Sequence, residues 1–116
     1  MTEAVSSGKF PAVPTTKILA IGHFHAPLTP EQRKQLLPQE VPDTVRLFLS
    51  GKIDQWWYRQ DGNGPVFLLN VTTIDEAKSL IDSLPLGTHG LMGFDFLELG
   101  PLRPLYLLLS EHGSVD

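Results

Sequence analysis

Two histidines lie two positions apart in the stretch KILAIGHFHAPLTPEQ, residues 17–32. Side chains two positions apart on a strand point to the same side, so His23 and His25 are expected to be neighbours. One imidazole could act as a general acid or base, because histidine exchanges a proton near neutral pH. Alternatively, both could bind one metal ion. In a third interpretation, His23 is a hydrogen-bonded core residue and His25 a solvent-facing strand end.

A metal site at this pair would need a further ligand. The sequence spacing does not select among the candidates, which are Asp54, His89, Asp95 and Glu98. The chain has no cysteine, which excludes thiolate catalysis, disulfides and iron–sulfur clusters. We therefore predict catalytic roles for His23 and His25, with no metal and no other cofactor.

A second group of candidates lies in the stretch DQWWYRQ. Strand alternation places Gln55, Trp57 and Arg59 on one side, and Trp56 and Tyr58 on the other. The aromatic rings could form a wall for a planar ligand, with Arg59 or Gln55 holding a carboxylate or carbonyl group. They could equally pack in a core or a dimer interface. We predict that the side with Trp57 binds substrate.

Two further candidates lie near the C-terminal end of the expected fold. His89 is in the glycine-rich loop LPLGTHGLMG, which could close over a pocket or simply connect two elements. Asp95 stands between two phenylalanines in FDFLEL, where it could face a ligand or point to solvent at an edge. We predict that both residues contribute to substrate binding.

The first expected strand covers residues 17–25 and precedes a helix-start signal. Thr29, Pro30 and Gln32 together fit a capping box with proline in the first turn. Pro38 and Pro42 lack the backbone donor that a helix interior needs. We therefore expect a short helix, a bend and a second helical piece rather than one straight helix.

The rest of the chain predicts strands, a hairpin around DGNGP and a second helix that begins after Thr73. This helix is expected to carry an apolar stripe of Ile74, Ala77, Ile81 and Leu84. The expected strands after the first cover residues 52–60, 66–71, 94–99 and 105–109. The order is β-α-β-β-α-β with an extra C-terminal strand. This order predicts an α+β, ferredoxin-like fold with an antiparallel sheet, in one domain over residues 17–110 between tails 1–16 and 111–116.

Helices in this arrangement cover one face of the sheet, yet the expected strands carry apolar residues on both faces. Two sheets packing face to face would bury the second face, so we predict a homodimer or a higher homo-oligomer. Parity places Leu19, Ile21, His23 and His25 on that second face, next to the cavity that a partner sheet would create. The helix-covered face is expected to hold Ile18, Ala20, Gly22 and Phe24.

Composition limits the partners. The 116 residues carry a net charge of −4, and the nine basic residues are scattered, so nucleic acid is not an expected partner. No apolar run approaches the roughly 20 residues of a membrane span. No phosphate-binding glycine loop and no serine-hydrolase turn occurs. We expect a cytoplasmic protein that binds a small molecule.

Residues 47–104 resemble the muconolactone isomerase family of the dimeric α+β barrel superfamily. The resemblance is carried by LFLSGKIDQWWYR, by VFLLNVTTIDEAKSLIDSLPL and by FDFLELGPLRP. It implies a cofactor-free isomerase that moves a proton along an unsaturated lactone during the breakdown of aromatic compounds. It also implies a base, a donor to the enolate oxygen and a cation for the carboxylate. By this analogy His23 or His25 is the base, Trp57 or His89 the donor and Arg59 the cation.

The leading prediction is thus a cofactor-independent isomerase, or a related proton-transfer enzyme, for a small unsaturated or cyclic carboxylate. Two alternatives stay open on the same fold. One is a non-catalytic protein that binds a small ligand or serves in assembly. The other is a metal-dependent oxygenase or lyase.

Overall fold

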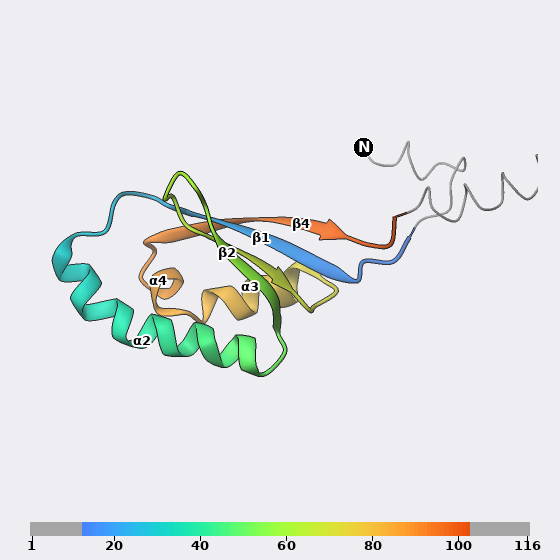
Figure 1. Ribbon diagram of the computed structural model, residues 1–116, viewed down its shortest axis with the longest axis horizontal. Helices are drawn as coiled ribbons and strands as arrows, with labels where there is room; N and C mark the ends of the chain where they lie inside the picture. Colours follow the sequence, from blue (N-terminus) through green and yellow to red (C-terminus); the bar gives the residue numbers. More distant parts are fainter. Residues whose placement is uncertain (1–12, 103–116) are drawn as a thin grey trace, which may run out of the picture.

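The computed structural model describes residues 13–102 of the chain (Figure 1). The predicted strand at 105–109, most of the predicted N-terminal tail and the predicted C-terminal tail lie outside this range. The four described residues of the N-terminal tail precede the first strand. Among them, the Thr16 amide donates to the Leu99 carbonyl at 2.8 Å and so extends a strand pairing.

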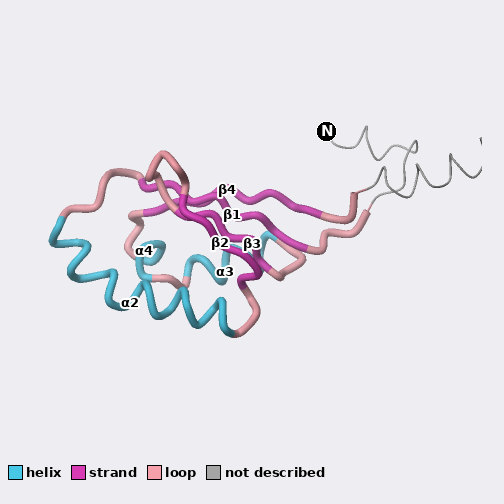
Figure 2. Tube along the Cα trace, viewed as in Figure 1, coloured by secondary structure: helices cyan, strands magenta, loops and turns pink. Residues whose placement is uncertain are grey.

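Four antiparallel strands form one sheet, in the order β2-β3-β1-β4. Figure 2 shows the helices gathered on one side of this sheet. The molecule is therefore a small α+β domain, compatible with a ferredoxin-like fold. In chain order the elements are β1 (Lys17–Phe24), α2 (Pro30–Leu49), β2 (Ile53–Tyr58), β3 (Pro65–Leu69), α3 (Ile74–Asp82), α4 (Pro85–Thr88) and β4 (Met92–Leu99).

The helix α2 is continuous, so the predicted break at its prolines is wrong, although its axis changes direction along its length (Figure 1). The expected capping box is confirmed, with Thr29 and Gln32 each bonded to the other's backbone amide. Each proline removes one backbone hydrogen bond, and the carbonyls left over belong to Lys34 and Pro38. Both residues are exposed, so water can bond to these carbonyls and the helix persists.

The main core lies between β1, β3 and α3. Ile18, Leu69 and Ile81 are almost fully buried there. Ala77 joins them from the predicted apolar stripe of α3, which is thereby confirmed. Leu47 and Phe48, near the C-terminal end of α2, pack against this cluster.

A second, smaller core cluster lies at the other end of α2. Leu36 of α2 packs there with Leu86 of α4 and Met92 of β4, and all three are buried. Leu37 and Phe24 are partly buried against them. The long helix therefore contacts the rest of the domain at two separate clusters, one near each end.

Strand parity in β1 is as predicted. Ile18 and Ala20 are fully buried under the helices, and Leu19 and Ile21 alternate with them on the opposite side. We call this opposite side the open face, since no helix of the described residues covers it (Figure 2). From the strand register it is made by Lys17, Leu19, Ile21, His23, Gln55, Trp57, Val66, Leu68, Asp95, Leu97 and Leu99.

Candidate functional site

A cavity of about 800 Å³ lies between α2 and the helix-covered side of the sheet. This volume is within the range of small-molecule sites, which is roughly 300–1,000 Å³. The middle of α2 forms one wall, and Phe67 and Met92 lie on the sheet side. The loop that follows β1 and the β2–β3 hairpin also line the cavity. The cavity is therefore enclosed by α2, the sheet, this loop and the hairpin.

Glu40 is the polar residue of this wall with the most perturbed environment. Its Oε1 accepts a hydrogen bond from the Leu86 amide at 2.9 Å, and the Thr44 hydroxyl lies 3.4 Å from its Oε2. Burial raises the pKa of the Glu40 carboxyl above its usual range, against the opposing effect of these two hydrogen bonds, and the nearby Asp43 carboxylate adds to the rise. A carboxylate in this state is a stronger base than an exposed one.

Aromatic side chains line much of the cavity. Trp56 and Tyr58 project from β2 into it, together with Phe24 and Phe67. The Trp56 ring stacks on Phe48 of α2, with 4.2 Å between ring centroids and planes 10° apart. This contact fixes the Trp56 ring against the helix, so the aromatic wall is preorganised for a flat apolar ligand.

The predicted division of β2 into two sides agrees with the strand register, but the side that lines the cavity is that of Trp56 and Tyr58. Gln55 and Trp57, predicted to bind substrate, lie on the open face, where the predicted cavity against a partner sheet would form. A β-bulge between Ile53 and Gln55 interrupts the pairing with β3. The register after this bulge decides which aromatic rings meet α2.

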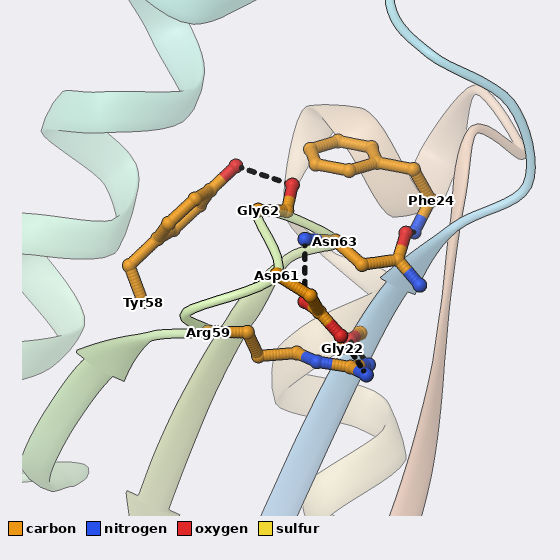
Figure 3. A network of polar contacts seen from close by, with 7 residues as sticks. All are labelled: Gly22, Phe24, Tyr58, Arg59, Asp61, Gly62 and Asn63. Atoms are coloured by element: carbon orange, nitrogen blue, oxygen red, sulfur yellow. Dashed lines mark hydrogen bonds and ion pairs between the residues drawn. The ribbon is translucent and has the colours of Figure 1, made fainter.

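Arg59 is held by the protein itself, as Figure 3 shows. One guanidinium nitrogen donates to the Gly22 carbonyl at 3.0 Å, and another contacts Asp61 Oδ2 at 2.7 Å. The Asn63 amide donates to Asp61 Oδ1 at 2.9 Å. This amide, followed by Arg59, lowers the pKa of the Asp61 carboxyl. The predicted carboxylate anchor thus braces the hairpin, and Arg59 is not among the residues that line the cavity.

The hairpin loop is tied to the end of β1. The Phe24 amide donates to the Asn63 carbonyl at 3.1 Å, and the Tyr58 hydroxyl donates to the Gly62 carbonyl at 3.1 Å (Figure 3). Gly64 has φ of +140°, and a Cβ at this position would lie 2.8 Å from the Gly22 carbonyl oxygen. Only glycine allows this approach, so the loop keeps a fixed position at the cavity wall.

The two histidines are neighbours, as predicted. Their ring centroids are 5.6 Å apart, with planes 78° apart. His23 is half-buried on the open face, and His25 is exposed just after β1 and also lines the cavity. Both rings occupy space above Gly93 of β4, where a Cβ would lie 2.8 Å from His23 Nε2 and 3.0 Å from His25 Cε1.

The remaining predicted residues are not part of the cavity lining. His89 is the C-cap of α4, and its Nδ1 lies 2.9 Å from the Pro85 carbonyl oxygen. Asp95 is exposed on the open face, opposite Ile21 of β1. Of the seven predicted site residues, only His25 lines the cavity.

Six polar residues of the cavity lining were not among the predicted ones, namely Arg33, Glu40, Thr44, Tyr58, Asp61 and Asn63. Glu40 stands between two prolines in a segment expected to be broken, so no helical face could be assigned to it from the sequence. Tyr58 lies on the side of β2 that was not predicted to bind substrate. Glu40 and Tyr58 could both have been identified if α2 had been predicted as one continuous helix opposite β2.

Among residues 13–102, no three histidine, aspartate or glutamate side chains come together in a way that could hold a metal ion. Over the same range, no helix is both long and apolar enough to cross a membrane. Comparison with models of known protein families and with curated proteins finds no match to the chain.

Proposed function

We propose that this protein is a cofactor-independent proton-transfer enzyme, of the isomerase type, that acts on a small unsaturated or cyclic carboxylate in the cavity beneath α2. The observation that carries the proposal is the half-buried Glu40 carboxyl in the wall of an aromatic-lined cavity, with its pKa raised by burial. A base of this kind can take a proton from a carbon next to a carboxylate or carbonyl group.

The cavity provides the other groups that such a reaction needs. Arg33 lines it and is the cation available for the substrate carboxylate, since Arg59 is engaged by Asp61 and Gly22. His25 is a second proton carrier in the lining. Trp56 and Tyr58 supply the apolar surface against which an unsaturated ring would lie.

The proposal includes membership of the muconolactone isomerase-like family, a ferredoxin-like βαββαβ topology and a cytoplasmic location. The strand order β2-β3-β1-β4, with antiparallel neighbours throughout, supports the topology. Two helical segments, α2 and the α3–α4 pair, precede β2 and β4 respectively, as that topology requires.

A homodimer formed through the open face is part of the same proposal. Trp57 and Leu97 on this face are 51% and 53% exposed, which is a high exposure for large apolar side chains. Leu19, Ile21 and Leu68 extend the apolar surface across the central strands. A second copy of the chain, packed sheet against sheet, would bury these side chains.

One observation favours a non-catalytic ligand-binding role as the second candidate. Both carboxyl oxygens of Glu40 lie near protein donors, Oε1 at the Leu86 amide and Oε2 at the Thr44 hydroxyl. A carboxylate held in this way could serve to join α2 to α4 rather than to accept a proton. In that case the cavity would bind a ligand without changing it.

The two roles differ in the fate of a carbon-bound proton. We would incubate the full chain with muconolactone and related unsaturated carboxylates in D₂O, and follow deuterium incorporation by NMR from pH 5 to 8. Enzymatic exchange that is lost in Glu40→Gln, and retained in the exposed control Glu31→Gln on the same helix, supports the base. Saturable ligand binding without exchange would support the non-catalytic role instead, and exchange at full rate in Glu40→Gln would remove Glu40 as the base.

A further inference from the structure

The distance between the His23 and His25 rings is close to that of two imidazoles on one ion. A zinc–nitrogen bond of about 2.0–2.1 Å at a tetrahedral angle places two ligand ring centroids roughly 5.2 Å apart. The centroids here are 5.6 Å apart, and the planes are at 78°. The observed spacing is therefore within a few tenths of an ångström of that in a zinc-bound pair, and the His25 side chain is exposed.

The neighbouring strand β4 has a glycine next to the two histidine rings, and the missing side chain leaves room for them. Gly93 of β4 pairs directly with His23 of β1. A Cβ at Gly93 would lie 2.8 Å from His23 Nε2 and 3.0 Å from His25 Cε1, both well inside normal contact. Any other residue at this position would push the two rings away, so the pair and the glycine form one arrangement.

The ring nitrogens of the pair have no hydrogen-bond partner among the described protein groups, whereas His89 Nδ1 lies 2.9 Å from a backbone carbonyl oxygen. Two adjacent imidazoles with unused nitrogens, His23 on β1 and His25 just after it, are suitable ligands for a borderline divalent metal ion. The described residues bring no third protein ligand to them. An ion at this pair would therefore keep open positions for water or for an oxygen of a bound molecule.

We propose that His23 and His25 bind one divalent transition-metal ion, such as Zn²⁺ or Cu²⁺, over Gly93 at the end of β1. The site lies at the border between the open face, which holds His23, and the cavity, which His25 lines. An ion there could take an oxygen of a cavity ligand into one of its open positions. This site is independent of the proposed proton transfer by Glu40. With the ion bound, His25 serves as a ligand and not as the second proton carrier of the cavity.

The test is a titration of the untagged full chain with ZnCl₂ by calorimetry, after treatment with a chelator and removal of that chelator. We expect one ion per chain, with an affinity that falls at least tenfold in His25→Ala and in His23→Ala. His89→Ala is the matched control and should leave the affinity unchanged. Because His25 is exposed, His25→Ala should fold normally, and circular dichroism with thermal unfolding would verify this.

Gly93→Ala tests the arrangement without removing a ligand. It should also lower the affinity at least tenfold, since the added methyl group displaces the His23 ring. Cu²⁺ electron paramagnetic resonance gives an independent readout, in which coupling to two equivalent nitrogens is expected and should be reduced to one in His25→Ala. Unchanged zinc affinity in folded His25→Ala, or an equal loss in His89→Ala, would overturn the site while leaving the role of Glu40 untouched.

Discussion

The Leu86 amide donates a hydrogen bond to Glu40 Oε1 at 2.9 Å and so joins α4 to the middle of α2. These residues are 46 positions apart in the sequence. The bond anchors the stretch of α2 that lies between its two prolines. It also orients the only carboxyl group in the cavity wall whose pKa is raised by burial. One side chain thus serves the packing of the helix and the chemistry of the cavity.

Removal of the Glu40 carboxyl should destabilise the fold. In Glu40→Ala the part-buried Leu86 amide loses its acceptor, and an unsatisfied buried donor costs about 1–3 kcal/mol. Glu40→Gln keeps an acceptor oxygen at the same place and should avoid most of this cost. Urea unfolding at pH 7 measures both free energies. Equal stability of wild type and Glu40→Ala would show that the bond does not hold α2.

The same residue predicts a pH dependence. The Glu40 pKa is raised in the folded state above its ordinary value of 4.5. Between these two pKa values the folded state binds more protons than the unfolded state, so the Glu40 contribution to stability falls as pH rises through this window. Glu40→Gln does not titrate. Urea unfolding from pH 4 to 8 should therefore show the stability of Glu40→Gln rising relative to wild type as pH increases, and a constant difference would contradict the raised pKa.

Gly64 should not tolerate a side chain. Gly64→Ala combines a φ of +140° with a Cβ 2.8 Å from the Gly22 carbonyl oxygen. The expected loss is about 3 kcal/mol or more, from backbone strain and steric overlap together. Gly51→Ala is the control, because Gly51 has φ of +85° and nothing within 4 Å of a new Cβ. Its loss should be about 1–2 kcal/mol. Thermal or urea unfolding compares the two variants.

The prolines inside α2 should cost stability. Pro38 is exposed in the helix interior, where proline is about 3 kcal/mol less favourable than alanine. Greater freedom of the unfolded chain offsets roughly 0.4–1 kcal/mol of the gain. Pro38→Ala should thus stabilise the protein by about 2 kcal/mol. Pro30→Ala, in the first turn where proline is well tolerated, should change stability by no more than about 0.5 kcal/mol. A destabilised Pro38→Ala would mean that the proline fixes a bend which the packing requires.

The open face should control the oligomeric state. Sedimentation velocity of the wild type should show a dimer or a larger assembly, and Leu97→Lys should shift it to a monomer of unchanged helix content. Leu97 is 53% exposed on the edge strand β4 of this face, opposite Leu19 of β1. Leu49→Lys replaces a leucine that is 76% exposed at the end of α2, and it should leave the assembly intact. A wild-type monomer at all concentrations would refute the homodimer.

The local elements of the fold could be predicted from the sequence because each has a short-range signal. The Thr29–Gln32 capping box starts α2, and the apolar stripe that includes Ala77 and Ile81 forms α3. Parity in β1 correctly separated the buried Ile18 and Ala20 from the open face. The course of α2 through Pro38 was not predictable in this way. Its helical state depends on tertiary contacts of Leu36 and Glu40 with Leu86, a residue distant in the sequence.

The site was predictable only in part, for the same reason. Residue type alone marked Arg59 as a carboxylate anchor, but the turn that brings Asp61 to its guanidinium engages it. Residue type could not identify Glu40 as a candidate base, because its raised pKa arises from burial in the folded chain rather than from its neighbours in sequence. Parity correctly divided the β2 side chains, but the side that lines the cavity depends on where α2 lies. The proximity of His23 to His25 was predictable because the two residues are only two positions apart, although β1 ends at Phe24 and His25 lies just after it.

The two attachment points of α2 determine how deep the cavity is. Leu36 rests on the cluster with Leu86 and Met92, Phe48 rests on Trp56 and the main core, and the cavity lies between these points. Neither Leu36 nor Phe48 is part of the lining. A smaller side chain at either position would let the helix settle toward the sheet and make the cavity shallower. Ligand selectivity can therefore change through substitutions that never touch the ligand.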